Sequence, residues 1–135
     1  MLLEIISGQP NADIEDAFAN IVKSYEEKGY NISCKSLILY PEIKYRHSKT
    51  LYNAIRKRVR ESIKNNEHLF IVTYSDHAFN ALRVEIKLHN FEGALCHQIR
   101  NDGKDTCSNI WRNGSIECWE EDVFDTWENA LFELT

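Results

Sequence analysis

Two spacings of apolar residues alternate along the chain before Asn90. Short, nearly continuous apolar runs at 2–6, 36–40 and 68–73 are typical of strands buried in a parallel sheet. Each run is followed by apolar residues that recur every third or fourth position, which indicates amphipathic helices; Asp13 is a good N-cap for the first of them. Alternating strands and helices with short connections predict an α/β fold, with a small, mostly parallel sheet flanked by helices.

After Asn90 the pattern changes to that of antiparallel hairpins. Asn101-Asp102-Gly103 and Arg112-Asn113-Gly114 are turn sequences, and they divide residues 93–119 into three short strands, an antiparallel β-meander. Asp122 then opens a C-terminal helix. One face of that helix is apolar and consists of Val123, Phe124, Trp127, Ala130, Leu131 and Leu134.

The composition is that of an ordinary globular chain. Its 135 residues are 43% hydrophobic and 27% charged, which favours a single domain, with a βαβαβα part at 1–90 and the meander and last helix at 91–135. No apolar run approaches the ~20 residues of a membrane span, and the N-terminal residues lack the basic stretch of a signal peptide. We therefore expect a cytoplasmic protein without a membrane partner, whose four cysteines are reduced.

Charge is distributed unevenly along the chain. From Arg46 to Lys64 there are seven Lys or Arg residues and one acid, whereas from Glu117 to Thr135 there are seven acids and no Lys or Arg. These segments are either solvated faces that attract each other, within one molecule or between copies, or a surface that binds a partner. The net charge of −5 gives no reason to expect a nucleic-acid partner.

Two adjoining segments resemble a known family. SLILYPEIKYRHSKTLYNAIRKRVRESI, which begins at Ser36, and LFIVTYSDHAFNALRVEIK, which begins at Leu69, are similar to the late part of ABC-type ATPases of the SMC-like and OLD-like (overcoming-lysogenization-defect) kind. In that family a Walker B strand ends in an acid followed by a Pro-Glu pair, and a second strand ends in a Thr-His-Ser-Asp-His turn that opens a helix. The segment from Gly114 to Trp119 and the pair Phe124-Asp125 look like the family's C-terminal ending.

The chain departs from the family at the residues that carry its chemistry. Leu39 stands where the metal-binding acid is expected, and Tyr74 stands where the switch histidine is expected. No Gly-rich loop with a Lys is present to cradle phosphates, and Leu39 cannot ligate Mg²⁺. The resemblance therefore implies the frame of an ATPase lobe without a bound cofactor or independent ATP hydrolysis. The positions that still match the family's nucleotide site are Glu42, Ser75, Asp76 and His77, together with Asn80 of the following helix.

Each of these matching positions also has a simpler interpretation. Glu42 is compatible with an exposed acid after a strand end, and Ser75 or Asp76 with a helix N-cap. His77 is then a surface side chain in the first turn of a helix.

The function we expect is that of a non-catalytic interaction protein, which regulates or inhibits a related ATPase by imitating its dimer face. Many family members serve in anti-phage defence, so the resemblance also suggests a phage or defence context. The alternatives are a subunit of a split ATPase completed in trans by a P-loop chain, and a metal-dependent or nucleic-acid-processing enzyme. The interaction residues expected from charge are Arg56, Lys57, Arg60, Glu120, Glu121, Asp122 and Asp125, with Trp111 and Trp119 as nearby exposed aromatics.

Three cysteines of the meander permit a metal hypothesis. Two-residue turns would place Asn109 opposite both Cys96 and Cys118, and Cys107 is two residues from Asn109 on the same strand. The three thiols would then lie on one face of the meander, with His97 pointing away. The wide spacing of the three cysteines is unlike the paired C-x-x-C units of most zinc sites. We expect these thiols to pack as reduced core residues, with zinc as the alternative.

Overall fold

The structure is a computed structural model that describes residues 2–30, 36–39, 48–120 and 123. The predictions for Glu42, Glu121 and Asp122 and for the helix beyond Val123 concern residues outside the described ranges. The elements in chain order are β1 (Leu3–Gly8), α1 (Ile14–Glu27), β2 (Ser36–Leu39), α3 (Ser48–Asn65), β3 (Leu69–Val72), α4 (Asp76–Leu88), β4 (Ala94–Ile99) and β5 (Asp105–Ile110).

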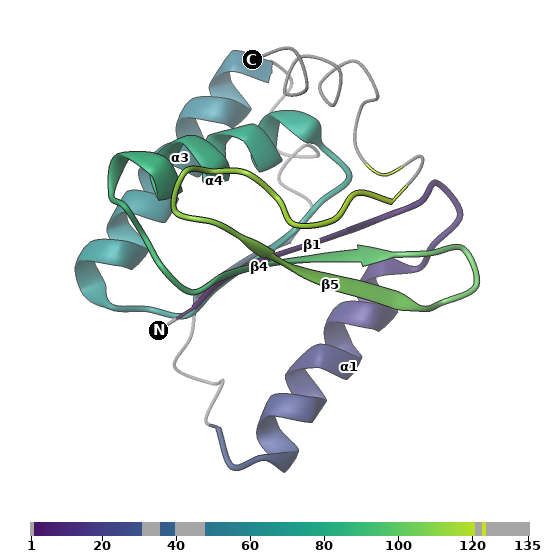
Figure 1. Cartoon of the computed structure of the whole chain (residues 1–135). Helices are drawn as coiled ribbons and strands as arrows, with labels where there is room; N and C mark the ends of the chain where they lie inside the picture. Colours follow the sequence, from purple (N-terminus) through teal and green to yellow (C-terminus); the bar gives the residue numbers. More distant parts are fainter. Residues whose placement is uncertain (1, 31–35, 40–47, 121–122, 124–135) are drawn as a thin grey trace.

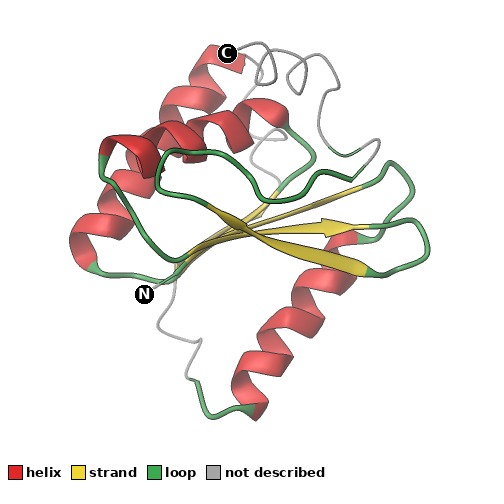
Figure 2. Cartoon of the chain, viewed as in Figure 1, coloured by secondary structure: helices red, strands yellow, loops and turns green. Residues whose placement is uncertain are grey.

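The strands form one sheet in the order β2-β3-β1-β4-β5. Strands β2, β3, β1 and β4 are parallel to one another, and β5 is antiparallel to β4. Helix α1 lies on one face of the sheet, and α3 and α4 lie together on the other (Figures 1 and 2). The predicted α/β class, with a mostly parallel sheet flanked by helices, is confirmed.

The hairpin after Asn90 extends this sheet. Strand β4 pairs in parallel with β1 along its whole length, from Leu3 beside Ala94 to Gly8 beside Ile99. The third strand expected in the meander is reduced to a single bridge between Ile110 and Ile116. The hairpin therefore continues the main sheet, with β5 as its last described strand.

Helices α1 and α4 begin where their capping residues predict. The Asp13 carboxylate accepts a hydrogen bond from the backbone N–H of Asp16 at 3.0 Å, and the Ser75 hydroxyl accepts one from Ala78 at 3.4 Å. Each side chain satisfies a backbone donor that a helix start leaves without an intrahelical partner.

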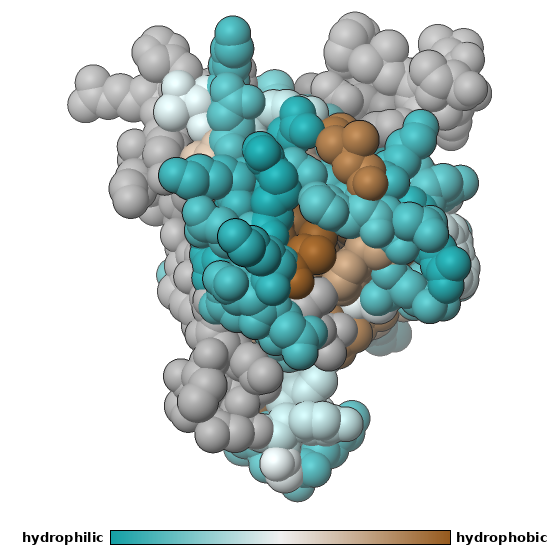
Figure 3. Space-filling view, turned by 90° about the vertical axis from the view of Figure 1, so that its left-hand side faces the viewer, coloured by the Kyte–Doolittle hydropathy of each residue, from teal (hydrophilic) through white to brown (hydrophobic). Residues whose placement is uncertain are grey.

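The core has two parts because β1 points alternate residues to opposite faces. Leu3 and Ile5 belong to the larger apolar cluster, which α3 and α4 complete, whereas Ile6 belongs to a smaller cluster under α1. Figure 3 shows the molecule from the left-hand side of Figure 1: among the coloured residues hydrophilic ones dominate, and hydrophobic ones show near the centre, between hydrophilic side chains, and in one patch at the upper right. No helix of the described residues is long and apolar enough to cross a membrane.

The segment after β5 closes one end of the larger cluster. Ile116 packs against that cluster, and Trp119 meets the Phe79 ring of α4 edge-on, with ring centroids 5.5 Å apart. The Gly-x-Ile-x-x-Trp segment thus supplies packing residues, and Trp119 is half-buried rather than exposed as expected.

Candidate functional site

Ser75, Asp76 and His77, which match the nucleotide site of the resembling family, follow the carboxyl end of the parallel strand β3. Strand β1 leads into α1 on one face of the sheet, and its neighbour β3 leads into α4 on the other face. Open α/β sheets bind ligands at such a point, outside the strand ends where neighbouring connections diverge. The loop 9–13 after β1 and the turn 73–75 after β3 meet here.

Tyr74 bridges these two loops. Its hydroxyl donates a hydrogen bond of 2.6 Å to the Ala12 carbonyl, while 41% of the residue remains exposed. On its other side, the β1 loop is tied to the hairpin turn after β4, where Asn11 N–H donates to the Asn101 side chain at 3.0 Å. Hydrogen bonds therefore hold together the loops that would have to part for a ligand to enter between them.

Ser75, Asp76 and His77, and the departing residue Leu39, are placed as follows. Ser75 is the N-cap of α4, which agrees with its simpler interpretation. The His77 side chain is 47% exposed and its Nε2 lies 3.8 Å from an Asp76 carboxylate oxygen, so both lie at the first turn of α4. Leu39 ends β2, in register with Val72 of β3.

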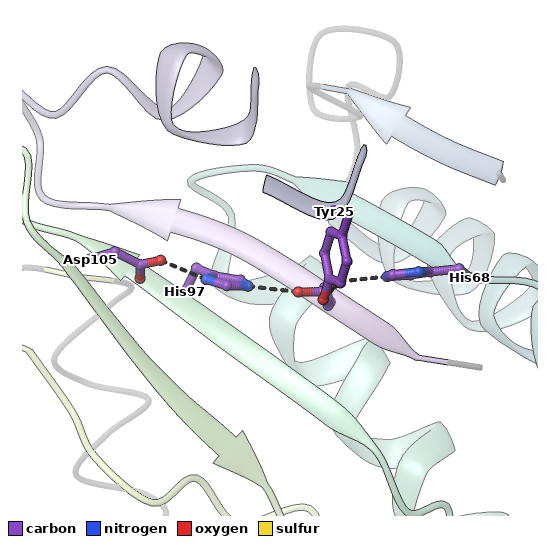
Figure 4. A network of polar contacts seen from close by, with 5 residues as sticks. Tyr25, His68, His97 and Asp105 are labelled. Atoms are coloured by element: carbon purple, nitrogen blue, oxygen red, sulfur yellow. Dashed lines mark hydrogen bonds and ion pairs between the residues drawn. The ribbon is translucent and has the colours of Figure 1, made fainter. Parts of the chain in front are cut away.

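A buried charged network, which sequence reasoning missed, lies on the α1 face of the sheet (Figure 4). Its centre is Glu4, the second residue of β1, which is 1% exposed. The Glu4 carboxylate accepts hydrogen bonds from His97 Nε2 at 2.8 Å, from the Tyr25 hydroxyl at 2.8 Å, and from His68 Nε2. His97 Nδ1 in turn contacts Asp105 at 2.7 Å. The network joins α1 to strands β1, β4 and β5 and to His68, which directly precedes β3.

The pKa values of this network follow from its contacts. Burial alone would raise the pKa of Glu4, but hydrogen bonds from His68, His97 and Tyr25 and the charge of His97 lower it from 4.5 to about 2. Burial alone would lower the pKa of His97, but Asp105, Cys107 and Glu4 raise it from 6.5 to about 11. The pKa of Tyr25 is raised first of all by burial and then, as the next largest cause, by the hydrogen bond to Glu4.

These values restrict what the network can do chemically. At neutral pH His97 is an imidazolium whose two nitrogens both face carboxylates, so it is a poor general base. The Glu4 carboxylate is buried and already accepts three hydrogen bonds, so it is unsuited to attack a substrate. The arrangement is suited to holding α1 on the sheet. A lone Glu inside the apolar run Leu2–Ile6 was the sequence signal for it.

The expected clustering of the meander cysteines is wrong. The register pairs Cys96 with Ser108 and His97 with Cys107, so Cys96 and Cys107 lie on opposite faces of the sheet. Cys96 is buried, where burial raises the pKa of its thiol, whereas Cys107 and Cys118 are exposed and are not core residues. No group of three or more His, Cys, Asp or Glu side chains in the described ranges is arranged to hold a metal ion.

The turns explain this error. Residues 101–103 form a three-residue loop with Gly103 at φ 87°. It is closed by hydrogen bonds from the Arg100 N–H to the Lys104 carbonyl and from the Gly103 N–H to the Arg100 carbonyl. The second turn has the same form, with Gly114 at φ 84°. A three-residue loop ending in a left-handed glycine shifts the pairing by one residue relative to a two-residue turn, and such a shift exchanges the faces of a strand.

The charged segments are partly neutralised within the molecule. Arg56 and Arg60 both bind the buried Glu85 carboxylate of α4, at 3.1 and 2.8 Å, while Lys57 is exposed on α3. Glu120 is half-buried and accepts a hydrogen bond of 2.7 Å from the Thr106 hydroxyl. Glu121, Asp122 and Asp125 lie outside the described residues.

Comparisons with protein-family models, with curated proteins and with solved structures found no match for this chain. The site is therefore interpreted from its own geometry.

Proposed function

We propose that this chain is a non-catalytic interaction protein, whose lobe resembles that of an ABC-type ATPase and whose partner is a related ATPase or a second copy of itself. The observation that carries the proposal is Tyr74. Its hydroxyl bonds the Ala12 carbonyl across the topological switch point, and its ring stays partly exposed. The position that would carry the family's switch histidine thus presents an anchored aromatic surface.

The chemistry of the two departing residues supports a role in binding. A histidine can gain or lose a proton near neutral pH, whereas a phenol with an ordinary pKa of about 10 cannot. Leu39, at the end of β2, offers no oxygen for Mg²⁺. A partner that binds this edge would meet Tyr74 beside the exposed His77, and tyrosine is among the residues that dominate binding energy at protein interfaces.

The ion pairs on α3 alter how much each residue of the expected basic surface can contribute to binding a partner. Glu85 offsets part of the charge of Arg56 and Arg60, so Lys57 contributes more to any long-range attraction of an acidic partner. We place the proposed interface at the Tyr74 edge first and at the α3 surface second.

The test is titration calorimetry of the purified chain with the ATPase encoded nearest to its own gene, alongside the partner's rate of ATP hydrolysis. Tyr74→Ala should weaken binding roughly tenfold or more, whereas Tyr74→Phe, which keeps the ring, should stay within a few-fold of the parent chain. Trp111→Ala is the matched control, because Trp111 is 48% exposed and follows β5 at the opposite edge of the sheet. Equal effects of Tyr74→Ala and Trp111→Ala would contradict the proposed interface.

One observation favours the split ATPase as a second candidate. Strands β2 and β3 are parallel neighbours, so the two segments that resemble the family's Walker B and switch regions end at one edge. A completing chain would have to supply the Mg²⁺ ligand that Leu39 lacks. ATP hydrolysis that appears only when the two chains are mixed, and that Ser75→Ala reduces, would replace the interaction proposal with this one.

A further inference from the structure

A cleft of about 530 Å³ lies between the loop that precedes β4 and the end of β5 with its following turn. Figure 1 shows these two segments side by side in the left half of the view, and an ion pair joins them. Gly93 and Ala94 belong to the wall, so the chain at the start of β4 contributes small residues that leave the space open. The volume falls in the range of sites that bind small molecules.

Trp111 is the aromatic residue of this cleft and is 48% exposed. The turn fixes its backbone, because its N–H donates to the Ser115 carbonyl and its carbonyl accepts from the Gly114 N–H, both at 2.8 Å. Within the described residues its indole has no ring partner and donates no hydrogen bond. The indole is therefore available to stack on a ligand, at a position that the turn holds in place.

The charged side chains of the cleft neutralise each other. The Arg112 guanidinium donates a hydrogen bond of 2.6 Å to the Glu92 carboxylate, and the two side chains are 53% and 77% exposed. They are the charged side chains among the described residues that line the cleft, so the site has no net charge. Neither an anion nor a cation gains a net attraction there, which favours an uncharged ligand.

Two side-chain amides supply polar partners. The Asn113 side-chain oxygen accepts hydrogen bonds from the Ser115 N–H at 3.0 Å and from the Ser115 hydroxyl at 2.6 Å, which leaves its NH₂ group as a donor. The Asn109 backbone carbonyl accepts from the Glu117 N–H at 3.0 Å, whereas its side-chain amide makes no hydrogen bond within the described part of the chain. Both residues line the cleft, so an amide donor and an amide acceptor are available to a ligand.

We propose that this cleft binds an uncharged saccharide, with one sugar ring stacked on Trp111 and its hydroxyls hydrogen-bonded by the amides of Asn109 and Asn113. The ion pair of Arg112 with Glu92 adds a donor and an acceptor at the rim, and both groups can bond hydroxyls without losing their own contact.

The arrangement of polar and apolar groups selects a sugar over a flat heterocycle. A pyranose ring has an apolar face of C–H groups and a rim of hydroxyls, so it needs one aromatic wall and several polar partners around its edge. A heterocyclic base has two apolar faces, whereas the described residues that line the cleft include one aromatic ring. The cleft therefore matches a sugar ring better than a base.

This site does not depend on the interaction proposal. It lies at the amino end of β4, whereas Tyr74 follows the carboxyl end of the parallel strand β3, so the two are at opposite ends of the sheet. Loss of saccharide binding should therefore leave the binding of an ATPase partner unchanged, and the two proposals can fail separately.

The test is an NMR titration of the full, isotope-labelled chain with the methyl glycosides of glucose, galactose, mannose and N-acetylglucosamine, and with adenosine as the heterocyclic comparison. We expect at least one glycoside to give saturable shifts of the Asn113 and Gly114 backbone amides and of the Trp111 indole N–H. The Kd should be on the order of 1 mM, as for a single ring at an open site. Raising the ionic strength should leave it within twofold, because the ligand is uncharged.

Variants of Trp111 test the stacking contact, with the backbone amides of Asn113 and Gly114 as the signals that remain. Trp111→Ala should weaken binding roughly tenfold or more, whereas Trp111→Tyr, which keeps an aromatic ring, should stay within about fivefold of the parent chain. Tyr30→Ala is the matched control, because Tyr30 is an aromatic residue that is 60% exposed and lies outside the cleft. It should leave binding within twofold.

Asn109→Ala tests the hydrogen bonds to the sugar hydroxyls and should weaken binding roughly fivefold to tenfold. Its control is Asn20→Ala, which removes an exposed amide from α1 and should leave binding within twofold. Circular dichroism checks that each variant is folded. The proposal is overturned if no glycoside gives saturable shifts, if adenosine alone does so, or if Tyr30→Ala weakens binding as much as Trp111→Ala.

Discussion

Glu4 and Ile5 are neighbours in β1, and they face opposite sides of the same sheet. Ile5 enters the larger apolar cluster beneath α3 and α4, while Glu4 is the centre of a charged network beneath α1. Apolar burial is non-directional and independent of pH, whereas the network depends on particular donors and on the ionisation of His97 and Glu4. The stability contributed by the face beneath α3 and α4 should therefore be independent of pH, and that contributed by the face beneath α1 should depend on it.

Removing the charge at the centre of the network should have the largest effect. Glu4→Gln leaves the His97 imidazolium with Asp105 alone and loses the ionic contact that Glu4 supplies, so we expect a loss of roughly 3–5 kcal/mol in the free energy of unfolding. Denaturant unfolding measures it. Glu15→Gln, an exposed acid of α1, is the control and should change stability by less than about 0.5 kcal/mol. A loss below about 1 kcal/mol for Glu4→Gln would mean that the network contributes little.

The corresponding change on the apolar face is Ile5→Ala. Ile5 is fully buried, so truncation should cost about 2–5 kcal/mol through lost burial and the cavity that remains. Both variants should also be measured across pH. The loss in free energy of unfolding for Ile5→Ala should be constant, whereas the loss for Glu4→Gln should shrink toward acid and toward alkaline pH. A pH-dependent loss for Ile5→Ala would remove the distinction between the two faces.

Stability of the parent chain should itself vary with pH. The folded-state pKa of His97, about 11, lies above its ordinary 6.5, so its stabilisation is complete below pH 6.5 and is lost as pH rises toward 11. Glu4, with a pKa of about 2 against 4.5, contributes fully above pH 4.5 and less as pH falls toward 2. Stability should therefore be greatest between pH 4.5 and pH 6.5, where both contributions are complete. From about pH 7 to about pH 9 the free energy of unfolding should decline by at most about 1.4 kcal/mol per pH unit.

Asp105→Asn separates His97 from other titrating groups in this experiment. It removes a carboxylate that raises the pKa of His97, so the decline above neutral pH should end at a lower pH and the total loss of stability should be smaller. A decline that continues to the same pH as in the parent chain would assign it to another group.

Tyr25→Phe should have the smallest effect. It deletes the hydroxyl that donates to Glu4 and keeps the ring contacts of α1 with His68 and Phe70, so the expected loss is about 1 kcal/mol. Hydrogen exchange of α1 amides should rise more than that of α4 amides, because Tyr25 attaches only α1 to the network. Equal increases in the two helices would show that the network stabilises the whole fold rather than the docking of α1.

Local sequence signals predicted the helices, because the contacts involved are local. Asp13 and Ser75 cap their helices through donors three residues away, so spacing alone identifies them. The network could not be found this way, since Glu4 meets His68 and His97 at sequence separations of 64 and 93 residues.

The hairpin register also exceeded what the sequence could specify. Asp102-Gly103 fits a two-residue turn and a three-residue loop equally well, and only the pairing of the flanking strands selects the second. That choice moved Cys107 from the expected core to the surface, and it placed Cys96 opposite Ser108. At the candidate site, the departing residue Tyr74 was recognised from the sequence, but its bond to Ala12 depends on the meeting of two distant loops.

The central position of β1 has a consequence for how the chain acquires its fold. This first strand pairs with β3 on one side and β4 on the other, so its partners are synthesised long after it. During translation β1 can pair with β3 once Val72 has left the ribosome, but its other side stays unpaired until the strand that ends at Ile99 has followed. Folding should therefore be slow for a domain of this size, with one side of an apolar strand exposed to aggregation or chaperones in the interval.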